Sequence, residues 1–132
     1  MIKFEDETIK GIFDSYPTEV REKLLFIREL IFEVYDDTKL ITTLTETLKW
    51  GEPSYVSDVG STVRITKVNG SNLQFGIYFN CKTTLISTFK EIFGNQFVYS
   101  GNRGLIFDIS NELNRDNIKH CIYLSLTYFS KN

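Results

Sequence analysis

The sequence is poor in the residues that build covalent or metal-held frameworks. It contains two cysteines, Cys81 and Cys121, and a single histidine, His120. The cysteines form no CxxC pair and no zinc-ligand spacing, and one histidine cannot form a histidine cluster. We therefore expect two reduced, buried thiols in a cytoplasmic protein, rather than a disulfide scaffold or a zinc module.

An excess of positive charge is also missing. Fifteen basic and seventeen acidic residues give a formal net charge of -2, and Lys and Arg form no runs. A general nucleic-acid binder needs a phosphate-neutralising surface, so this balance argues against nucleic acid as a partner. No apolar run is long enough to span a bilayer, and the acidic N-terminus does not resemble a signal peptide. We expect a cytoplasmic protein that does not bind membranes.

The motifs of the commonest enzyme families are absent. The chain has no GxSxG, Walker loop, GxGxxG or HExxH. His120 and Cys121 are neighbours on a predicted helix, where adjacent side chains point about 100° apart and cannot pair as base and nucleophile. A meeting of Cys81 with His120 in space is the alternative, and we favour structural thiols over it. We assign no catalytic residue, and the balance is against an enzyme.

What the sequence does have is apolar and aromatic side chains. They make up 42% and 14% of the 132 residues, enough for a sizeable core in one domain spanning residues 1–132. Apolar residues at helical spacing predict helices over residues 5–14, 18–36, 83–93 and 114–129. The stripe of the second helix recurs at steps of four and three, and its members are Val20, Leu24, Ile27, Ile31 and Val34.

Strand patterns occupy the second half of the chain. Residues 62–68 and 73–79 flank Asn69-Gly70, a strong hairpin signal, and two more strands are expected over 96–100 and 105–109. Residues 40–49 have helical spacing and are predicted as a third N-terminal helix, stopped by Trp50-Gly51. This order predicts an α+β fold, with a mainly antiparallel sheet packed against N-terminal and C-terminal helices.

Two places are candidates for ligand binding. Trp50, Glu52 and Tyr55 surround a rigid bend, where rings and one charge could line a pocket. The alternative, which we favour, is that Trp50 fills the gap between helix and sheet, because a lone Trp is usually well buried. Arg103 lies in a glycine-bracketed turn that could present backbone N–H groups and a guanidinium to an anion. A plain hairpin turn explains those glycines equally well.

A ridge of acidic residues is a candidate for metal binding. Taking about 100° per residue, Glu19, Glu22, Glu29 and Glu33 fall in one arc of the 18–36 helix, away from its apolar stripe. Carboxylate oxygens in such a ridge suit a hard cation or a basic protein partner. A solvated outer face is the alternative, since an amphipathic helix normally carries charge there.

Residues 48–55 read Leu-Lys-Trp-Gly-Glu-Pro-Ser-Tyr, which resembles the Lys-aromatic-Gly-x-Pro-x-Tyr signature of the bacterial YdhG-like family, a domain of unknown function. Residues 75–79 resemble that family's central aromatic strand, residues 103–107 its later strand, and residues 114–129 its closing helix. The resemblance implies a frataxin-like α+β fold. For one branch it implies iron handling for iron–sulfur or haem assembly, which would give the acidic ridge a purpose.

Three hypotheses follow. The first is a small YdhG-like binding protein that carries iron weakly on the acidic ridge or a small ligand near Trp50. The second is a protein–protein interaction module without catalytic activity, which docks through the acidic helix or an exposed sheet surface. The third, ranked last, is an enzyme that uses Glu52 with Tyr55 or Arg103 as its partner.

Overall fold

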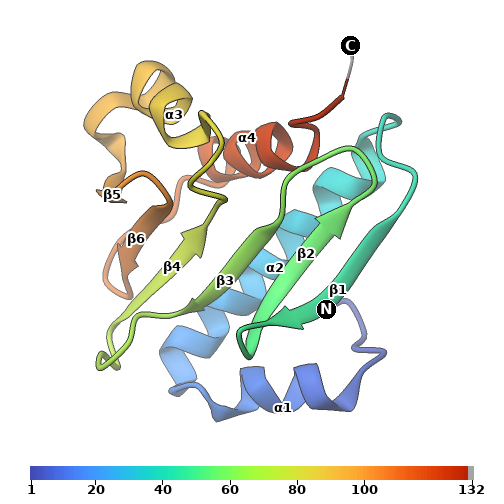
Figure 1. Ribbon diagram of the computed structural model, residues 1–132. Coiled ribbons are helices and arrows are strands. Elements are labelled where there is room, and N and C mark those ends of the chain that lie inside the picture. Colours follow the sequence, from blue (N-terminus) through green and yellow to red (C-terminus); the bar gives the residue numbers. More distant parts are fainter. Residues whose placement is uncertain (131–132) are drawn as a thin grey trace.

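A six-stranded antiparallel sheet lies against a layer of helices in the computed structural model, which describes residues 1–130 (Figure 1). In chain order the elements are α1 (Glu7–Ser15), α2 (Thr18–Asp37), β1 (Leu44–Lys49), β2 (Glu52–Ser57), β3 (Val63–Lys67), β4 (Gln74–Tyr78), α3 (Leu85–Phe93), a 3₁₀ turn (Gly94–Gln96), β5 (Val98–Ser100), β6 (Gly104–Asp108) and α4 (Arg115–Leu126). The predicted α+β class is confirmed.

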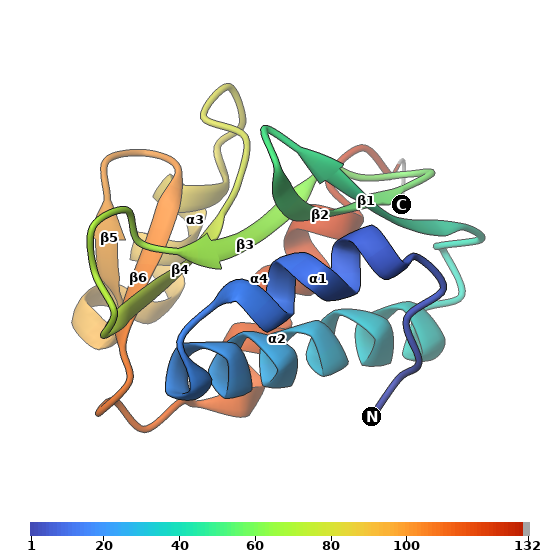
Figure 2. The same cartoon turned by 90° about the horizontal axis from the view of Figure 1, so that it is seen from below.

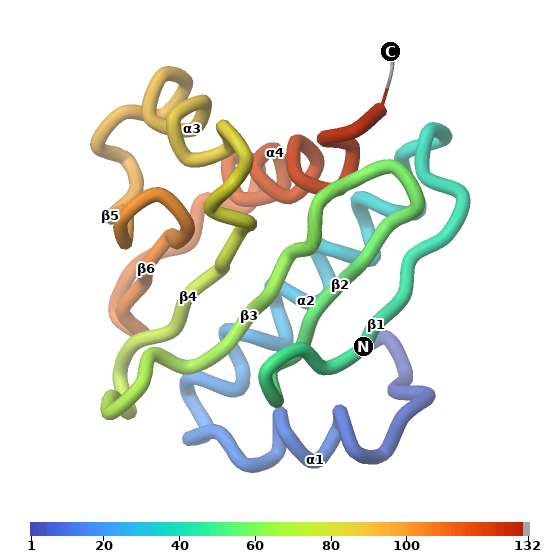
Figure 3. Tube along the Cα trace, in the orientation of Figure 1, coloured from blue at the N-terminus to red at the C-terminus, as the bar shows by residue number. Residues whose placement is uncertain are grey.

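The strands lie in the order β1-β2-β3-β4-β6-β5, and every neighbouring pair is antiparallel. Helices α2 and α4 run behind this sheet and contact each other, while α1 crosses one end of the layer against α2 and β2 (Figures 1 and 2). Figure 3 traces how the chain makes both helices α1 and α2 before it enters the first hairpin. Side chains alternate between the two faces along each strand. One set therefore faces the helices and is buried, and the other set lies on the open face of the sheet.

Helices α1 to α4 form close to where apolar residues at helical spacing predict them. The whole apolar stripe of α2 is buried, from Val20 to Val34. Asp6 caps α1 by accepting hydrogen bonds from the backbone N–H groups of Thr8 and Ile9, and Asn114 caps α4 in the same way. Among residues 1–130 we find no helix with both the length and the apolar character that a bilayer crossing requires.

The prediction of a helix over residues 40–49 is wrong. Residues Leu44–Lys49 form β1, which pairs with β2 from Leu44 opposite Ser57 to Lys49 opposite Glu52. The segment from residue 42 to residue 47 contains four threonines, of which Thr45 and Thr47 lie in β1, and β-branched side chains favour strands. Gly51 therefore acts as a hairpin residue, not as a helix cap.

The expectation that Trp50 plugs the core is also wrong. Its side chain is 91% exposed, because it occupies the two-residue turn beyond the last pair of the β1–β2 hairpin. Both turn residues have positive φ, 56° at Trp50 and 73° at Gly51, as a type I′ turn requires. The fully buried ring of this hairpin belongs to Tyr55. Phe129, predicted on the buried side of the last helix, lies beyond the end of α4 and is 65% exposed.

A buried ionic network joins the hairpin to the helices. The guanidinium of Arg28 in α2, 1% exposed, donates from Nε to Oε2 of Glu46 in β1 at 2.6 Å. It also donates to the backbone carbonyls of Ile2 and Lys3 at 2.5 and 3.3 Å. The hydroxyl of Tyr55 in β2 donates to the same carboxylate oxygen at 2.7 Å. Each buried charge thus has both a counter-charge and hydrogen-bond partners.

Aromatic rings enclose this network. The guanidinium carbon of Arg28 lies 3.8 Å from the ring centre of Phe4 and 5.0 Å from that of Phe32. Burial lowers the pKa of Arg28, but the hydrogen bond and charge of Glu46 outweigh it, so the pKa is raised overall. Burial, and then the charge of Glu46, hold the pKa of Tyr55 well above its usual value. The phenol therefore stays neutral.

Removing the carboxylate should destabilise the fold strongly. Glu46→Gln leaves the Arg28 guanidinium buried without a counter-charge, so we expect the free energy of unfolding to fall by about 3–5 kcal/mol in urea denaturation. Tyr55→Phe removes only a hydroxyl and should cost about 1.5–3 kcal/mol. Asp14→Asn, which breaks the exposed Lys10–Asp14 pair, is the control and should leave the midpoint nearly unchanged. Equal midpoints for all three variants would contradict a structural role for the network.

Alkaline pH should weaken the protein through Tyr55. Because its pKa is higher in the folded state, the folded protein keeps a proton that the unfolded chain loses above about pH 10. Stability from this residue is therefore complete below that pH and is lost as the pH rises. Urea midpoints measured from about pH 8 to about pH 11 should fall more steeply for the wild type than for Tyr55→Phe. Parallel curves would contradict the prediction.

The positive φ at Trp50 predicts a stabilising substitution. Asn tolerates a left-handed backbone better than Trp, and the exposed indole contributes little burial. We expect Trp50→Asn to raise the free energy of unfolding by about 0.5–1 kcal/mol and Trp50→Val to lower it, both measured by chemical denaturation. Destabilisation by Asn would show that the indole makes a contact that its exposure does not reveal.

Candidate anion-binding site

The open face of the sheet carries a row of polar side chains that run across the strands. The register places Ser54 of β2 opposite Arg64 of β3, Arg64 opposite Tyr78 of β4, and Tyr78 opposite Gly104 of β6. Residues opposite one another share a face, so these side chains all point away from α2 and α4. The β1–β2 hairpin and the loop after β4 both rise on this side of the sheet (Figure 2).

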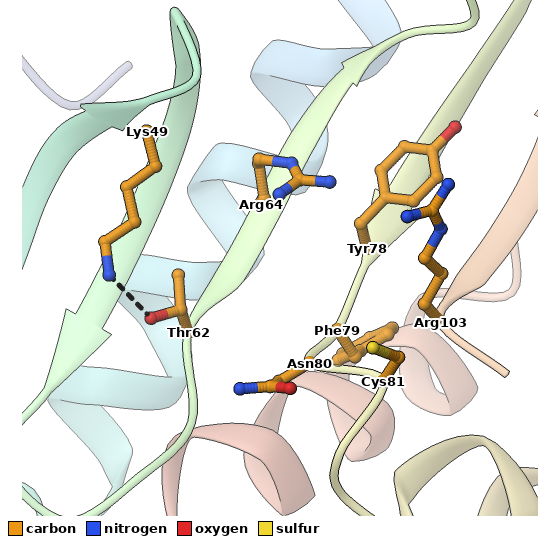
Figure 4. A pocket seen from close by; sticks show the side chains of 8 residues that line it. All are labelled: Lys49, Thr62, Arg64, Tyr78, Phe79, Asn80, Cys81 and Arg103. Atoms are coloured by element: carbon orange, nitrogen blue, oxygen red, sulfur yellow. Dashed lines mark hydrogen bonds between the residues drawn. The ribbon is translucent and has the colours of Figure 1, made fainter.

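A cavity of about 250 Å³ lies on this face. Its lining residues come from β1, β3 and β4, from the segment after β4, and from the residues just before β3 and β6, and are Lys49, Thr62, Arg64, Tyr78, Phe79, Asn80, Cys81 and Arg103 (Figure 4). Three of these side chains are cationic and none is a carboxylate. The cavity is therefore suited to an anion.

Lys49 reaches the cavity from the last position of β1. Its Nζ lies 3.3 Å from Oγ1 of Thr62, just before β3, and donates a hydrogen bond to it (Figure 4). Since β2 lies between β1 and β3, the lysine side chain crosses β2, where Ser54 is fully buried on this otherwise open face. The aliphatic stem thus covers the strand while the ammonium is carried to the cavity.

Arg64 is held in place from one side. Its Nε lies 2.7 Å from Oε1 of Glu52, but the N–H bond is not aligned with that oxygen, and the buried Nε has no hydrogen bond. On its other side the guanidinium carbon lies 5.4 Å from the ring centre of Tyr78. Glu52 therefore neutralises and orients Arg64 without saturating its five donors.

Arg103 is carried by the turn between β5 and β6. The carbonyl of Arg103 accepts from the backbone N–H of Phe79 at 2.7 Å, and Nδ2 of Asn102 donates to the carbonyl of Cys81 at 3.3 Å. Gly101 in this turn has a φ of 54°. These bonds anchor the turn to the end of β4, and the guanidinium of Arg103 lies beside the ring of Tyr78 (Figure 4).

The structure separates the four residues predicted to bind a ligand. Arg103 lines the cavity, and Glu52 adjoins it through its ion pair with Arg64. Trp50 follows Lys49 in the chain but points into solvent at the hairpin tip. Tyr55 lies on the opposite, buried face, where its hydroxyl is bonded to Glu46. The bend therefore contributes to the site through Glu52 and through Lys49, which the sequence did not single out.

The predicted acidic ridge is divided among different contacts. Glu33 pairs with Arg115 and Lys119 of α4, and these bonds lower its pKa. Glu29 accepts a hydrogen bond from the backbone N–H of Ile2 at 2.8 Å, whereas Glu19 and Glu22 are exposed. In the described part of the chain, no group of three or more His, Cys, Asp or Glu side chains is placed to share a metal ion.

The two thiols also differ from expectation. Cys121 is buried, as predicted, and burial raises its pKa. Cys81 is exposed and lines the cavity, so its predicted burial is wrong. His120 packs edge-on against Phe93, with ring centres 5.6 Å apart, and lines a different cavity between α2 and α4. The structure gives Cys81 no histidine partner in its own cavity.

Arg64 and Tyr78 were missed because they look unremarkable in the sequence. Each is a polar position inside an apolar strand, Arg64 between Val63 and Ile65, and Tyr78 between Ile77 and Phe79. Alternation places both on the open face, but only the pairing of β3 with β4 brings them together. The sequence did contain a signal that could have found them: a cation and an aromatic ring, Arg64 and Tyr78, stand at outward positions of two strands that were predicted to pair.

Comparison with known proteins adds no family assignment. The chain was compared with family models, curated proteins and solved structures, and none of them matched. The kinship with the YdhG-like family thus stays a prediction from the signature at residues 48–55.

Proposed function

We propose that this protein binds a small anionic ligand in the cavity on the open face of its sheet. The observation that carries the proposal is the convergence of Lys49, Arg64 and Arg103, from three separate segments, on one cavity that no carboxylate lines. This is the small-ligand hypothesis, with the ligand placed beside Lys49 and Arg103 instead of against Trp50. A YdhG-like protein of this kind would act as a carrier or sensor of its ligand.

Electrostatics support an anion as the ligand. Glu52 pairs with Arg64, but neither Lys49 nor Arg103 makes an ion pair with any residue from 1 to 130. Like charges on one cavity repel each other, and a bound carboxylate or phosphate removes that repulsion while it accepts charge-assisted hydrogen bonds. The forked donors of two arginines suit the oxygens of such a group.

The alternatives have less support. An enzyme based on Glu52 needs a free acid or base, yet Glu52 is tied to Arg64 and Tyr55 lies across the sheet. An interaction module needs a contiguous docking surface, and the large exposed apolar residues of the described chain are spread over several elements: Trp50, Leu73 and Val98 in three hairpins, Ile92 in α3, Tyr123 in α4, and Met1 and Phe129 outside the helices and strands. We do not extend the proposal to iron, because Glu29 and Glu33 of the ridge are already engaged.

Titration with inorganic phosphate tests the proposal. At low ionic strength, amide NMR signals from β3, the end of β4 and the β5–β6 turn should shift together and saturate. Arg103→Gln and Arg64→Gln should each weaken the apparent affinity by roughly tenfold, the usual loss for one charge-assisted hydrogen bond. The affinity should also fall as salt is added.

Arg115→Gln is the matched control. It removes the same charge from the chain, but at the start of α4, where Arg115 pairs with Glu33 and not with the cavity. The control should bind phosphate like the wild type. Absence of saturable shifts, or an equal loss of affinity in Arg115→Gln and Arg103→Gln, would refute an anion site in this cavity and leave only a general charge effect.

A further inference from the structure

The ring of Tyr78 lies unusually close to the backbone of two glycines on the open face. A Cβ atom built on Gly76 would lie 2.7–2.8 Å from the Cε2, Cζ and hydroxyl atoms of Tyr78, and one built on Gly104 would lie 3.0 Å from Cδ1 and Cε1. Real Cβ atoms essentially never approach other atoms more closely than about 3.0 Å. The tyrosine ring therefore lies over two glycines on adjacent strands, in space that side chains would otherwise fill.

The glycines have no other evident reason to be there. Neither Gly76 nor Gly104 has a positive φ, and glycine within a strand weakens the sheet. An aromatic ring over strand glycines restores part of that packing. Here the arrangement also holds the ring low on the sheet, against the backbone, where Tyr78 lines the cavity and the guanidinium carbon of Arg64 lies over the ring.

We propose that the ligand is a small aromatic anion whose ring stacks on Tyr78 while Arg64 and Arg103 hold its anionic group. This inference rests on the proposed anion site and specifies its ligand class. Arg64 lies 5.4 Å from the tyrosine ring centre on one side, and Arg103 lies on another (Figure 4). A planar ligand stacked on the ring thus presents its carboxylate or phosphate to guanidinium groups.

The size of the cavity favours a single ring. Its volume of about 250 Å³ is below the roughly 300–1,000 Å³ typical of pockets for drug-sized ligands. Phe79 adds apolar wall, and Thr62 and Asn80 add neutral hydrogen-bonding groups. An aromatic carboxylate and an aromatic phosphate share the chemistry required here, so both serve as probes.

The experiment compares ligands that match in charge but differ in the ring. Dissociation constants are measured by calorimetry or NMR for phenyl phosphate against inorganic phosphate, and for benzoate against cyclohexanecarboxylate. Stacking should make each aromatic member bind tighter by on the order of tenfold, as aromatic stacking does elsewhere. The stronger of the two aromatic probes then identifies phosphate or carboxylate as the preferred anionic group.

Two variants remove the ring platform by different routes. Tyr78→Leu deletes the ring, and Gly76→Ala displaces it by placing a methyl group in its seat without altering any polar atom. Both should bring the affinity ratio of aromatic to non-aromatic probe close to one. Gly11→Ala in α1, where an added Cβ meets nothing within 4 Å, is the matched glycine control and should keep the wild-type ratio.

Cys81 reports where the probe binds. Its exposed thiol lines the cavity, whereas the thiol of Cys121 is buried and serves as an internal reference. Saturating phenyl phosphate should slow alkylation of Cys81 by iodoacetamide severalfold in the wild type. Unchanged alkylation during saturable binding would place the probe elsewhere and overturn the inference.

The outcomes separate this inference from the proposed function. Equal affinities for aromatic and non-aromatic probes, with both lost in Arg103→Gln, would overturn the aromatic ligand and leave the anion site standing. Absence of binding for all four probes would overturn both. An aromatic preference that survives in Tyr78→Leu and Gly76→Ala would show that another surface supplies the stacking, and this also overturns the inference.

Discussion

The buried pair of Arg28 and Glu46 is the interaction on which the rest of the structure depends. It fastens β1 to α2, takes in the hydroxyl of Tyr55 from β2, and binds two carbonyls of the N-terminal segment. Glu46 must point inward to make this contact, so the alternation of β1 is determined along its whole length. Lys49, three positions later, therefore lies on the open face. A core contact thus decides which side of the hairpin is available to a ligand.

The two faces of the sheet differ in how their charged side chains are paired. On the buried face the charges of Arg28 and Glu46 neutralise each other and are hydrogen-bonded, as low dielectric surroundings demand. On the open face Lys49 and Arg103 line one cavity without a carboxylate partner, and Glu52 pairs only with Arg64. Solvent screens the repulsion between these cationic side chains, and a bound anion would replace that repulsion with attraction. The same surface accepts two strand glycines, whose cost Tyr78 offsets by covering them.

The sequence predicted the elements whose signals are local. Helices α2 and α4 follow from apolar residues at helical spacing, and the β3–β4 hairpin follows from Asn69-Gly70. It was misleading over residues 44–49, where apolar side chains at helical spacing coincide with a strand. There the pairing with β2 and the burial of Glu46 against Arg28 override the spacing. Trp50 was misplaced for the same reason, since a helix end at that point became a hairpin turn.

By itself the sequence determined the α+β class, most element boundaries and one member of the site, Arg103. Periodicity, caps and turn residues are properties of neighbours in the chain, so they can be read without knowing the fold. Only the tertiary structure decided that Lys49, Arg64, Tyr78 and Arg103 share a cavity, that Tyr55 faces away from it, and that the acidic ridge is divided among other partners. The physical reason is that strand order and side-chain alternation bring together residues far apart in sequence. Both are decided by which buried contacts are the most stable, and these contacts form only in the folded chain.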